Sequence, residues 1–405
     1  MFPVLREWSA LSKLSKPLRT IAELLVVGIC TLTFAITALG FVVSLLRRDA
    51  VGTRDFVEYW ASGSLLAHHA DPYESGAILR VERSVGFNLP AQIMANPPWA
   101  LPLVLPLGFL SPRAGYLLWI LSSIACLVAS VRIIWAMHGR PTTDWNILGY
   151  TFAPALLCLL AAQVTIYVLF GLVLFLRWHR SRPFMAGVSL WLCLLKPHLF
   201  LPFGMVLLAW IILSKCYKVL AGTAVALGVS TAITLVFDPH IWAHYLRMMS
   251  AARLDQANVP CLSILLRQQV WPHTLWLQWL PATLGCIWAL AYFWRHRHNW
   301  DWMKDGSLLI LVSVLVPPYT WILDQAVLIP ALLHGAYTTQ SRGLIAFLAL
   351  TSAVIEIGLF RRTSVLQSFF FLWTVPAWLA WYLCAVRRGD RIGADDFSPS
   401  LAEGD

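Results

Sequence analysis

Long apolar runs recur along most of the chain, and short polar segments separate them. A helix that crosses a membrane needs about 20 apolar residues, and shorter or broken helices occur at membrane depth where they line a cavity. The pattern therefore predicts an all-α polytopic membrane protein with a bundle of about 12 transmembrane helices. The runs that carry this prediction are 20–46, 99–110, 114–137, 147–176, 184–196, 198–213, 219–237, 275–293, 303–318, 320–337, 343–359 and 366–386.

Two segments are too polar to cross a bilayer, and we expect both to form outer loops. The first, 47–98, is rich in Asp and Glu, and its apolar positions from Phe56 to Leu66 recur at helical spacing. This spacing predicts helices that lie on the membrane surface. The second, 238–270, is rich in His and Arg. We expect 1–388 to form one transmembrane domain and 389–405 a polar cytoplasmic tail.

Lys and Arg residues of the short loops gather on the side of the N-terminus. Because positively charged short loops stay in the cytoplasm, we expect both termini inside and the two long polar segments outside. Two interruptions are also expected. The run 147–176 is too long for one straight helix, so Pro154 is expected to break it. Two short runs meet at Lys196-Pro197, where the chain is expected to leave backbone groups free for a ligand.

Composition narrows the class of protein. Hydrophobic residues make up 59% of the chain, and charged residues make up 12%, about half the usual share of a soluble domain. This excludes a soluble globular enzyme. The net charge is +10, but the basic residues lie in small clusters between apolar runs, so we expect no nucleic-acid partner. The eight Cys residues are scattered, and nucleotide-binding and zinc-protease motifs are missing, so we expect no metal and no cofactor.

Asp55 and Glu58 are the first candidates for chemistry. They stand three residues apart, so a helix places both carboxylates on one face. Such a pair raises the pKa of one member, as a general base requires. Asp55 also follows the first apolar run closely, on the side where a reaction at the membrane face is within reach. The alternative is a solvated surface carboxylate beside Arg54.

Polar groups inside or beside the apolar runs are costly, so they are functional candidates. Lys196, next to His198, either extends to the membrane interface or offers a point charge to a phosphate. Asp324 either accepts a sugar hydroxyl or pairs with Lys196 or an Arg as a structural partner. Gln163, inside the overlong run, is a candidate of the same kind. In the second polar segment, Arg247 and Arg267 either bind a lipid phosphate or belong to a solvated basic surface.

Four short motifs occur in an informative order. They are Asp55-Phe56 with Tyr59-Trp60-Ala61 and Asp71-Pro72-Tyr73, then Asn96-Pro97-Pro98 with Leu105-Pro106-Leu107, then Leu195-Lys196-Pro197-His198, and finally Pro318-Tyr319-Thr320-Trp321 with Asp324. Together they resemble the GT-C glycosyltransferases, and within them glycosyltransferase family 87 (GT87), the polyprenyl-phosphate-mannose-dependent α-1,2-mannosyltransferases and their relatives. One departure is Ala162-Gln163, where the family pattern has Gly-Gln.

The resemblance implies a GT-C-like bundle and an inverting membrane glycosyltransferase. Asp55 would be the general base, with Glu58 beside it. The residues implied to bind the donor phosphate are Lys196, His198, Arg247 and Arg267, and those implied to contact substrate are Tyr59, Asn96, Gln163, Trp321 and Asp324. The implied partners are a polyprenyl-phosphate-linked sugar donor, with mannose expected, a glycolipid or polysaccharide acceptor, and the lipid bilayer. The expected location is the bacterial inner membrane, with the active site on the periplasmic face. A multi-spanning transporter or flippase is the alternative, and a polymerase-like protein of surface polysaccharide is a third.

Overall fold

The computed structural model describes residues 16–46, 54–87, 90–251, 259, 261–272, 274–361 and 369–395. Every regular element in these residues is a helix, which confirms the all-α prediction. Within this described part of the chain, four helices are long and apolar enough to cross a membrane: Thr20–Val43, Pro112–Met137, Tyr217–Phe237 and Phe369–Arg387. Several other apolar helices are only 10–17 residues long. The structure therefore supports a membrane protein, and the expected 12 crossings are not confirmed.

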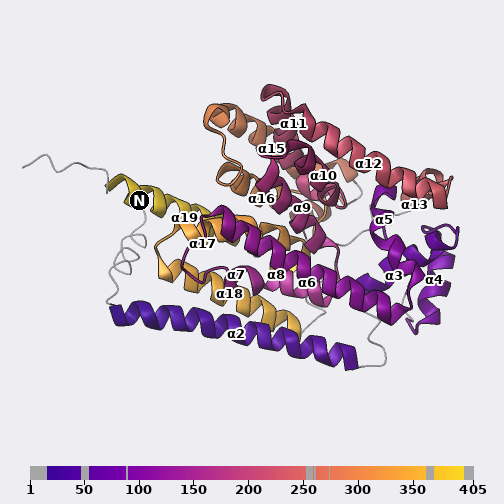
Figure 1. Ribbon diagram of the computed structural model, residues 1–405, viewed down its shortest axis with the longest axis horizontal. Coiled ribbons are helices and arrows are strands. Elements are labelled where there is room, and N and C mark those ends of the chain that lie inside the picture. Colours follow the sequence, from indigo (N-terminus) through magenta and orange to yellow (C-terminus); the bar gives the residue numbers. More distant parts are fainter. Residues whose placement is uncertain are drawn as a thin grey trace, which may run out of the picture.

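Figure 1 shows how the helices are arranged. Helix α2 runs from one end of the bundle to the other beside α18, and α3, α4 and α13 gather at the end where α2 stops. Helices α3 and α4 of the first polar segment and α13 of the second therefore lie at one end of the molecule. The elements are α2 (Lys16–Leu46), α3 (Arg54–Ala67), α4 (Ser75–Ser84), η2 (Pro98–Ala100), α5 (Leu101–Val104), η3 (Leu105–Phe109), α6 (Pro112–Met137), α7 (Ile147–Tyr150), α8 (Ala153–Leu160), α9 (Thr165–Trp178), α10 (Pro183–Cys193), η4 (Pro197–Phe200), α11 (Leu201–Leu213), α12 (Tyr217–Phe237), α13 (Ile241–Ala251), α14 (Leu262–Val270), α15 (Leu275–His296), η6 (Arg297–Asn299), α16 (Asp305–Leu315), η7 (Ile322–Leu328), α17 (Ile329–Thr338), α18 (Arg342–Arg361), η9 (Phe369–Trp373) and α19 (Thr374–Asp395).

The overlong run 147–176 is broken twice. Pro154 lies in the first turn of α8, where a proline needs no hydrogen-bond donor, so the first break precedes it. The second break separates α8 from α9 at residues 161–164. There Ala162 has a φ of 57°, in the left-handed region that glycine occupies without strain. This conformation gives a physical reason for the Gly-Gln of the family pattern at a position where this chain has Ala162-Gln163.

Helix α3 forms as its apolar spacing predicts, but its apolar face packs on protein. Phe56 lies edge-on to Tyr116 of α6, with the ring centroids 5.1 Å apart. The Trp60 indole N–H donates a hydrogen bond to the Leu110 carbonyl oxygen at 3.1 Å. The face expected to rest on the membrane surface is therefore buried against the end of the bundle. This packing fixes the direction in which the polar face of α3 points.

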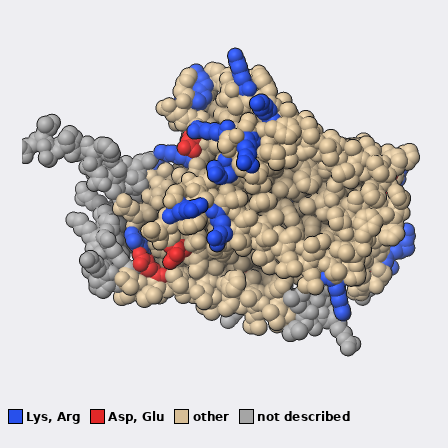
Figure 2. Space-filling view, in the orientation of Figure 1, with Lys and Arg blue, Asp and Glu red and all other residues tan. Residues whose placement is uncertain are grey.

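The charged side chains are unevenly distributed along the molecule. Figure 2 shows Lys and Arg gathered over the half of this face that lies toward α19 and the ends of α11 and α15. The middle of the face carries almost none, and a few reappear near the end formed by α3, α4 and α13. A band without charge between two charged zones is the pattern expected of a protein that sits across a bilayer.

Glycines bring α10 and α12 into close contact. A methyl group added at Gly222 of α12 would meet the carbonyl oxygen of Phe184 in α10, whereas one added at Gly228 would meet nothing within 4 Å. We expect Gly222→Ala to lower the free energy of unfolding by about 1–3 kcal/mol, because the two backbones must separate. Thermal unfolding in detergent measures the effect, with Gly228→Ala as the matched control in the same helix. Equal melting temperatures for the two variants would contradict the close contact.

Candidate active site

Asp55 is held by a chain of hydrogen bonds that starts at the break between α8 and α9. The amide Nε2 of Gln163 donates to Asp55 Oδ2 at 3.0 Å. Gln163 Oε1 accepts from the Tyr59 hydroxyl at 2.7 Å and from the Val164 amide at 2.8 Å. Because Oε1 already receives two donors, the amide nitrogen has to face Asp55. The backbone break thus sets the orientation of the carboxylate.

Lys196 and Asp324 form a buried ion pair. Lys196 Nζ lies 2.6 Å from Asp324 Oδ1, and the two residues are 9% and 1% exposed. The same oxygen accepts from the Thr165 hydroxyl at 2.9 Å, and Oδ2 accepts from the Trp321 amide at 2.9 Å. Of the alternatives that the sequence left open for Asp324, this geometry favours pairing with Lys196.

The turn from Gln163 to Thr165 connects these two groups. Gln163 contacts Asp55 on one side, and Thr165 contacts Asp324 on the other. Lys196 also acts electrostatically on Glu58, which lies one helical turn from Asp55. Five of the predicted side chains therefore belong to one cluster, which we call the Asp55 cluster: Asp55, Glu58, Gln163, Lys196 and Asp324. Thr165 was missed by sequence reasoning, although a hydroxyl two residues after Gln163 in an apolar run was a usable signal.

Glu58 is the member of the Asp55–Glu58 pair whose pKa is raised. Burial raises its pKa well above the usual value, the Asp55 charge raises the pKa further, and Lys196 opposes the shift. A folded-state pKa above that of the unfolded chain means that the unfolded chain releases the proton first as the pH rises. The protonated Glu58 carboxyl therefore makes its full contribution to the free energy of unfolding below about pH 4.3, the pKa of a glutamate in the unfolded chain. This contribution declines as the pH rises to the folded-state pKa.

We expect Glu58→Gln to lose less stability than the wild type as the pH rises, because glutamine stays neutral at every pH. Melting temperatures in detergent at pH 5 and pH 8 measure the effect, and the variant should lose less between the two than the wild type. Asp144→Asn, the same acid-to-amide change at an exposed position, is the control. A wild-type pH dependence in Glu58→Gln would contradict a raised pKa.

The segment that begins at Asn96 holds the broken end of α10. Asn96 Nδ2 donates to the Leu195 carbonyl at 2.7 Å, and the Trp99 indole donates to the Leu194 carbonyl at 2.9 Å. These are carbonyl groups that the end of a helix leaves without partners. The Asn96 carbonyl in turn accepts from the Tyr73 hydroxyl at 2.8 Å. Asn96 therefore contacts the residue that precedes Lys196, which fits a positioning role.

His198 lies in η4, directly after the Lys196-Pro197 break. Its ring stacks on Tyr319, with the centroids 3.8 Å apart. Nε2 of His198 is buried and has no protein hydrogen-bond partner among the described residues. A buried polar atom without a partner is uncommon, and an oxygen of a bound ligand or of a water molecule would satisfy it.

Arg247 and Arg267 make their described contacts away from Lys196. Arg247 lies in α13 with its guanidinium 4.0 Å from Asp71, and its side chain is 71% exposed. Arg267 is buried in α14 and donates to Gln278 of α15 at 2.7 Å. The described contacts thus tie Arg267 to the packing of α14 on α15, and they leave the phosphate role of both residues a prediction.

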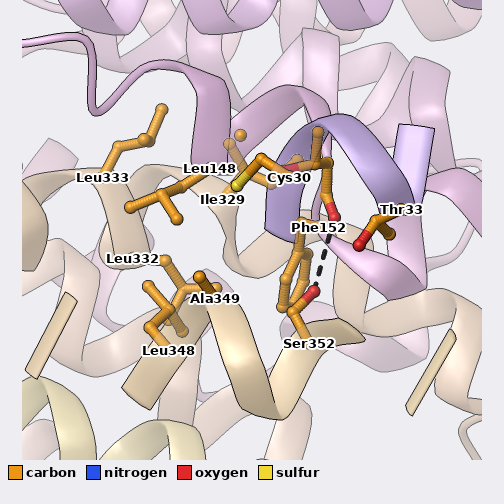
Figure 3. A pocket seen from close by; sticks show the side chains of 12 residues that line it. Cys30, Thr33, Leu148, Phe152, Ile329, Leu332, Leu333, Leu348, Ala349 and Ser352 are labelled. Atoms are coloured by element: carbon orange, nitrogen blue, oxygen red, sulfur yellow. Dashed lines mark hydrogen bonds between the residues drawn. The ribbon is translucent and has the colours of Figure 1, made fainter. Parts of the chain in front are cut away.

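Figure 3 shows a cavity elsewhere in the bundle, between α2, α7, α17 and α18. Its volume is about 10 Å³, and its polar lining residues are Thr33, Thr151 and Ser352. The Ser352 hydroxyl donates to the Thr151 carbonyl at 3.4 Å. A space of this size holds about one water molecule, and its lining contains no charged group. This cavity is therefore no candidate for the active site.

The described residues contain no group of three or more His, Cys, Asp or Glu side chains arranged to hold a metal ion. The comparisons with known proteins give one match. The sequence profile described as glycosyltransferase family 87 matches residues 95–318, more than half of the chain. The matched segment includes Asn96, Gln163 and Lys196, whereas Asp55 and Asp324 lie outside it. No curated protein and no solved structure matches the chain.

Proposed function

The chain belongs to glycosyltransferase family 87 and is a membrane glycosyltransferase, and we propose that it uses a polyprenyl-phosphate-linked sugar as donor and inverts the anomeric carbon. The acceptor is a hydroxyl of a glycolipid or polysaccharide, and mannose is the proposed sugar. One observation carries the proposal: an oriented carboxylate, Asp55, and a buried lysine, Lys196, are connected through Asp324 and the turn from Gln163 to Thr165. This is the pair of groups that such a displacement needs.

Asp55 takes the proton from the acceptor hydroxyl as its oxygen attacks the anomeric carbon. The bond from that carbon to the phosphate oxygen breaks, and its electron pair leaves with the phosphate. General-base catalysis of this kind contributes about 10²- to 10⁴-fold to a rate. Because the attack is a single direct displacement, the product has the opposite anomeric configuration to the donor.

Lys196 stabilises the negative charge that develops on the departing phosphate. Asp324 holds the ammonium group in place at 2.6 Å, and a lysine has two further N–H groups to offer a ligand. His198 adds its buried Nε2 as a second contact. In this arrangement Asp324 and Asn96 are positioning residues, while Tyr59 and Gln163 fix the base.

The site lies at the end of the bundle that carries α3, α4 and α13. Lys and Arg gather toward the opposite end. Since the more basic side of a membrane protein stays in the cytoplasm, we propose that the site faces the periplasm of a bacterial inner membrane. A polyprenyl-phosphate donor suits that location, because its lipid chain remains in the bilayer while its sugar reaches the site.

Incubation of the purified protein with a panel of labelled polyprenyl-phosphate sugars tests the proposal. We expect one member of the panel to give a new glycosidic bond, with the anomeric configuration inverted in the NMR spectrum of the product. Proteoliposomes prepared from the same protein provide the opposing test. Accumulation of the labelled lipid or of a solute without any new glycosidic bond would replace the proposal with a transporter.

A further inference from the structure

A wide apolar groove lies between α11 and α15, away from the candidate active site. Its volume is about 520 Å³, and its lining includes Ala209 and Leu213 of α11 with Ala291, Trp294 and Arg295 of α15. The small side chains of Ala209 and Ala291 leave the space that the larger neighbours surround. Leu213 and Trp294 are 52% and 57% exposed, so the groove opens to the outside of the bundle.

The groove is at the far end of α11 from Lys196. Lys196 lies just before α11, whereas Leu213 is the last residue of that helix. A helix of 13 residues is about 20 Å long. The groove is therefore separate from the Asp55 cluster, and it lies toward the end of the molecule where Figure 2 shows Lys and Arg gathered.

Basic residues lie in the lining of the groove and in the segments next to it. Arg295 lines it directly, and the Arg297 guanidinium stacks 4.1 Å from the centroid of the Trp294 ring. Arg297 also donates to the Trp294 carbonyl at 2.6 Å. Lys215 follows the last residue of α11 by two positions and is exposed. The nearby acid Asp301 already accepts from the amides of Met303 and Lys304, at 2.6 and 3.4 Å.

The apolar lining and the nearby cations indicate which kind of molecule fills the groove. An apolar groove on a helix bundle in a bilayer meets lipid tails, and an empty groove would lose the van der Waals contacts of its lining. Tails alone give little preference, because they are as apolar as the side chains that they replace. The cations at the end of the groove supply the preference, since basic pockets between membrane helices bind anionic headgroups.

We propose that this groove binds an anionic phospholipid, with one acyl chain between α11 and α15. The headgroup phosphate contacts Arg295, Arg297 and Lys215. The site is independent of the sugar donor, so the proposal stands whether or not the transfer reaction is the one given above. Its occupant contributes to the packing of α11 on α15, and α11 follows Lys196 through η4.

Native mass spectrometry of the full-length protein tests this site, after exchange into phosphatidylglycerol or phosphatidylcholine. We expect the wild type to retain phosphatidylglycerol preferentially. The double variant Arg295→Gln/Arg297→Gln should bind it about 30-fold more weakly, because each cation near an anionic headgroup contributes about 1 kcal/mol. Arg387→Gln, an exposed arginine of α19, is the matched control and should bind as the wild type does.

A second variant, Ala291→Phe, fills the groove and leaves every charge in place. Because Ala291 is exposed, this change is compatible with folding, and circular dichroism verifies that the variant is folded. We expect it to lose phosphatidylglycerol as well. Equal retention of the two lipids by the wild type, or unchanged retention of phosphatidylglycerol by the double variant or by Ala291→Phe, would overturn the proposal.

Discussion

Replacing Asp55 with asparagine is expected to lower sugar transfer by about 10²- to 10⁴-fold, the contribution of a general base. Asparagine has nearly the same size as aspartate, and its side-chain oxygen can still accept the hydrogen bond that Gln163 donates to Asp55 at 3.0 Å. What the variant loses is the ability to take a proton from the acceptor hydroxyl. Folding and donor binding should therefore remain close to wild type.

The measurement is the initial rate of transfer from the labelled donor, together with the affinity for that donor in the absence of acceptor. Asp144→Asn is the matched control, because Asp144 is an exposed aspartate in the connection between α6 and α7. Full activity in Asp55→Asn would show that Asp55 is not the base. A loss of activity that accompanies a loss of donor binding would assign Asp55 to binding instead.

The members of the Asp55 cluster could be named from the sequence, and the pairing of Asp324 with Lys196 was one of its alternatives, but the sequence could not decide which side chains meet. Asp55 and Gln163 are 108 positions apart, and Lys196 and Asp324 are 128 positions apart. Each is conspicuous because a polar group beside an apolar run is costly. Which of these side chains meet depends on how α3, α9 and η7 pack against one another. Helical periodicity shows which face of a helix is buried but does not show its neighbour.

The break between α8 and α9 is a second feature that the sequence predicts only in part. The length of the run 147–176 predicts an interruption, and a proline is the usual cause. The decisive turn is instead formed by Ala162 in a left-handed conformation, with its carbonyl accepting from the Trp119 indole at 2.7 Å. That hydrogen bond comes from α6, so the position of the turn is a tertiary effect.

Arg247 and Arg267 show which roles the charge of a side chain leaves open. Both belong to the second polar segment, and both carry the charge that a phosphate requires. Arg267 is 1% exposed and donates to Gln278, and a buried arginine in such a bond contributes first to packing. Distinguishing the two roles requires knowledge of which face of α14 is buried, which depends on the packing of α15.

The Lys196–Asp324 pair allows structural and chemical roles to be separated. Lys196→Met leaves the Asp324 carboxylate buried without its cation, and breaking a buried pair in this way costs about 3–5 kcal/mol. In Lys196→Met/Asp324→Asn both charges are gone. The asparagine oxygen can still accept the hydrogen bond that Thr165 donates to Asp324 at 2.9 Å in the wild type. We expect the double variant to recover most of the melting temperature that the single variant loses.

Transfer activity should not recover with stability, because the cation that faces the departing phosphate is still missing from the double variant. Melting temperature and initial rate, measured on the same detergent-purified samples, give the comparison, and Lys218→Met at an exposed position of α12 is the control. A double variant that regains both stability and transfer would limit Lys196 to a structural role. A Lys196→Met variant as stable as the wild type would mean that the ion pair contributes little to the fold. The evidence for Lys196 as the phosphate-binding cation would then be the initial rate of transfer alone.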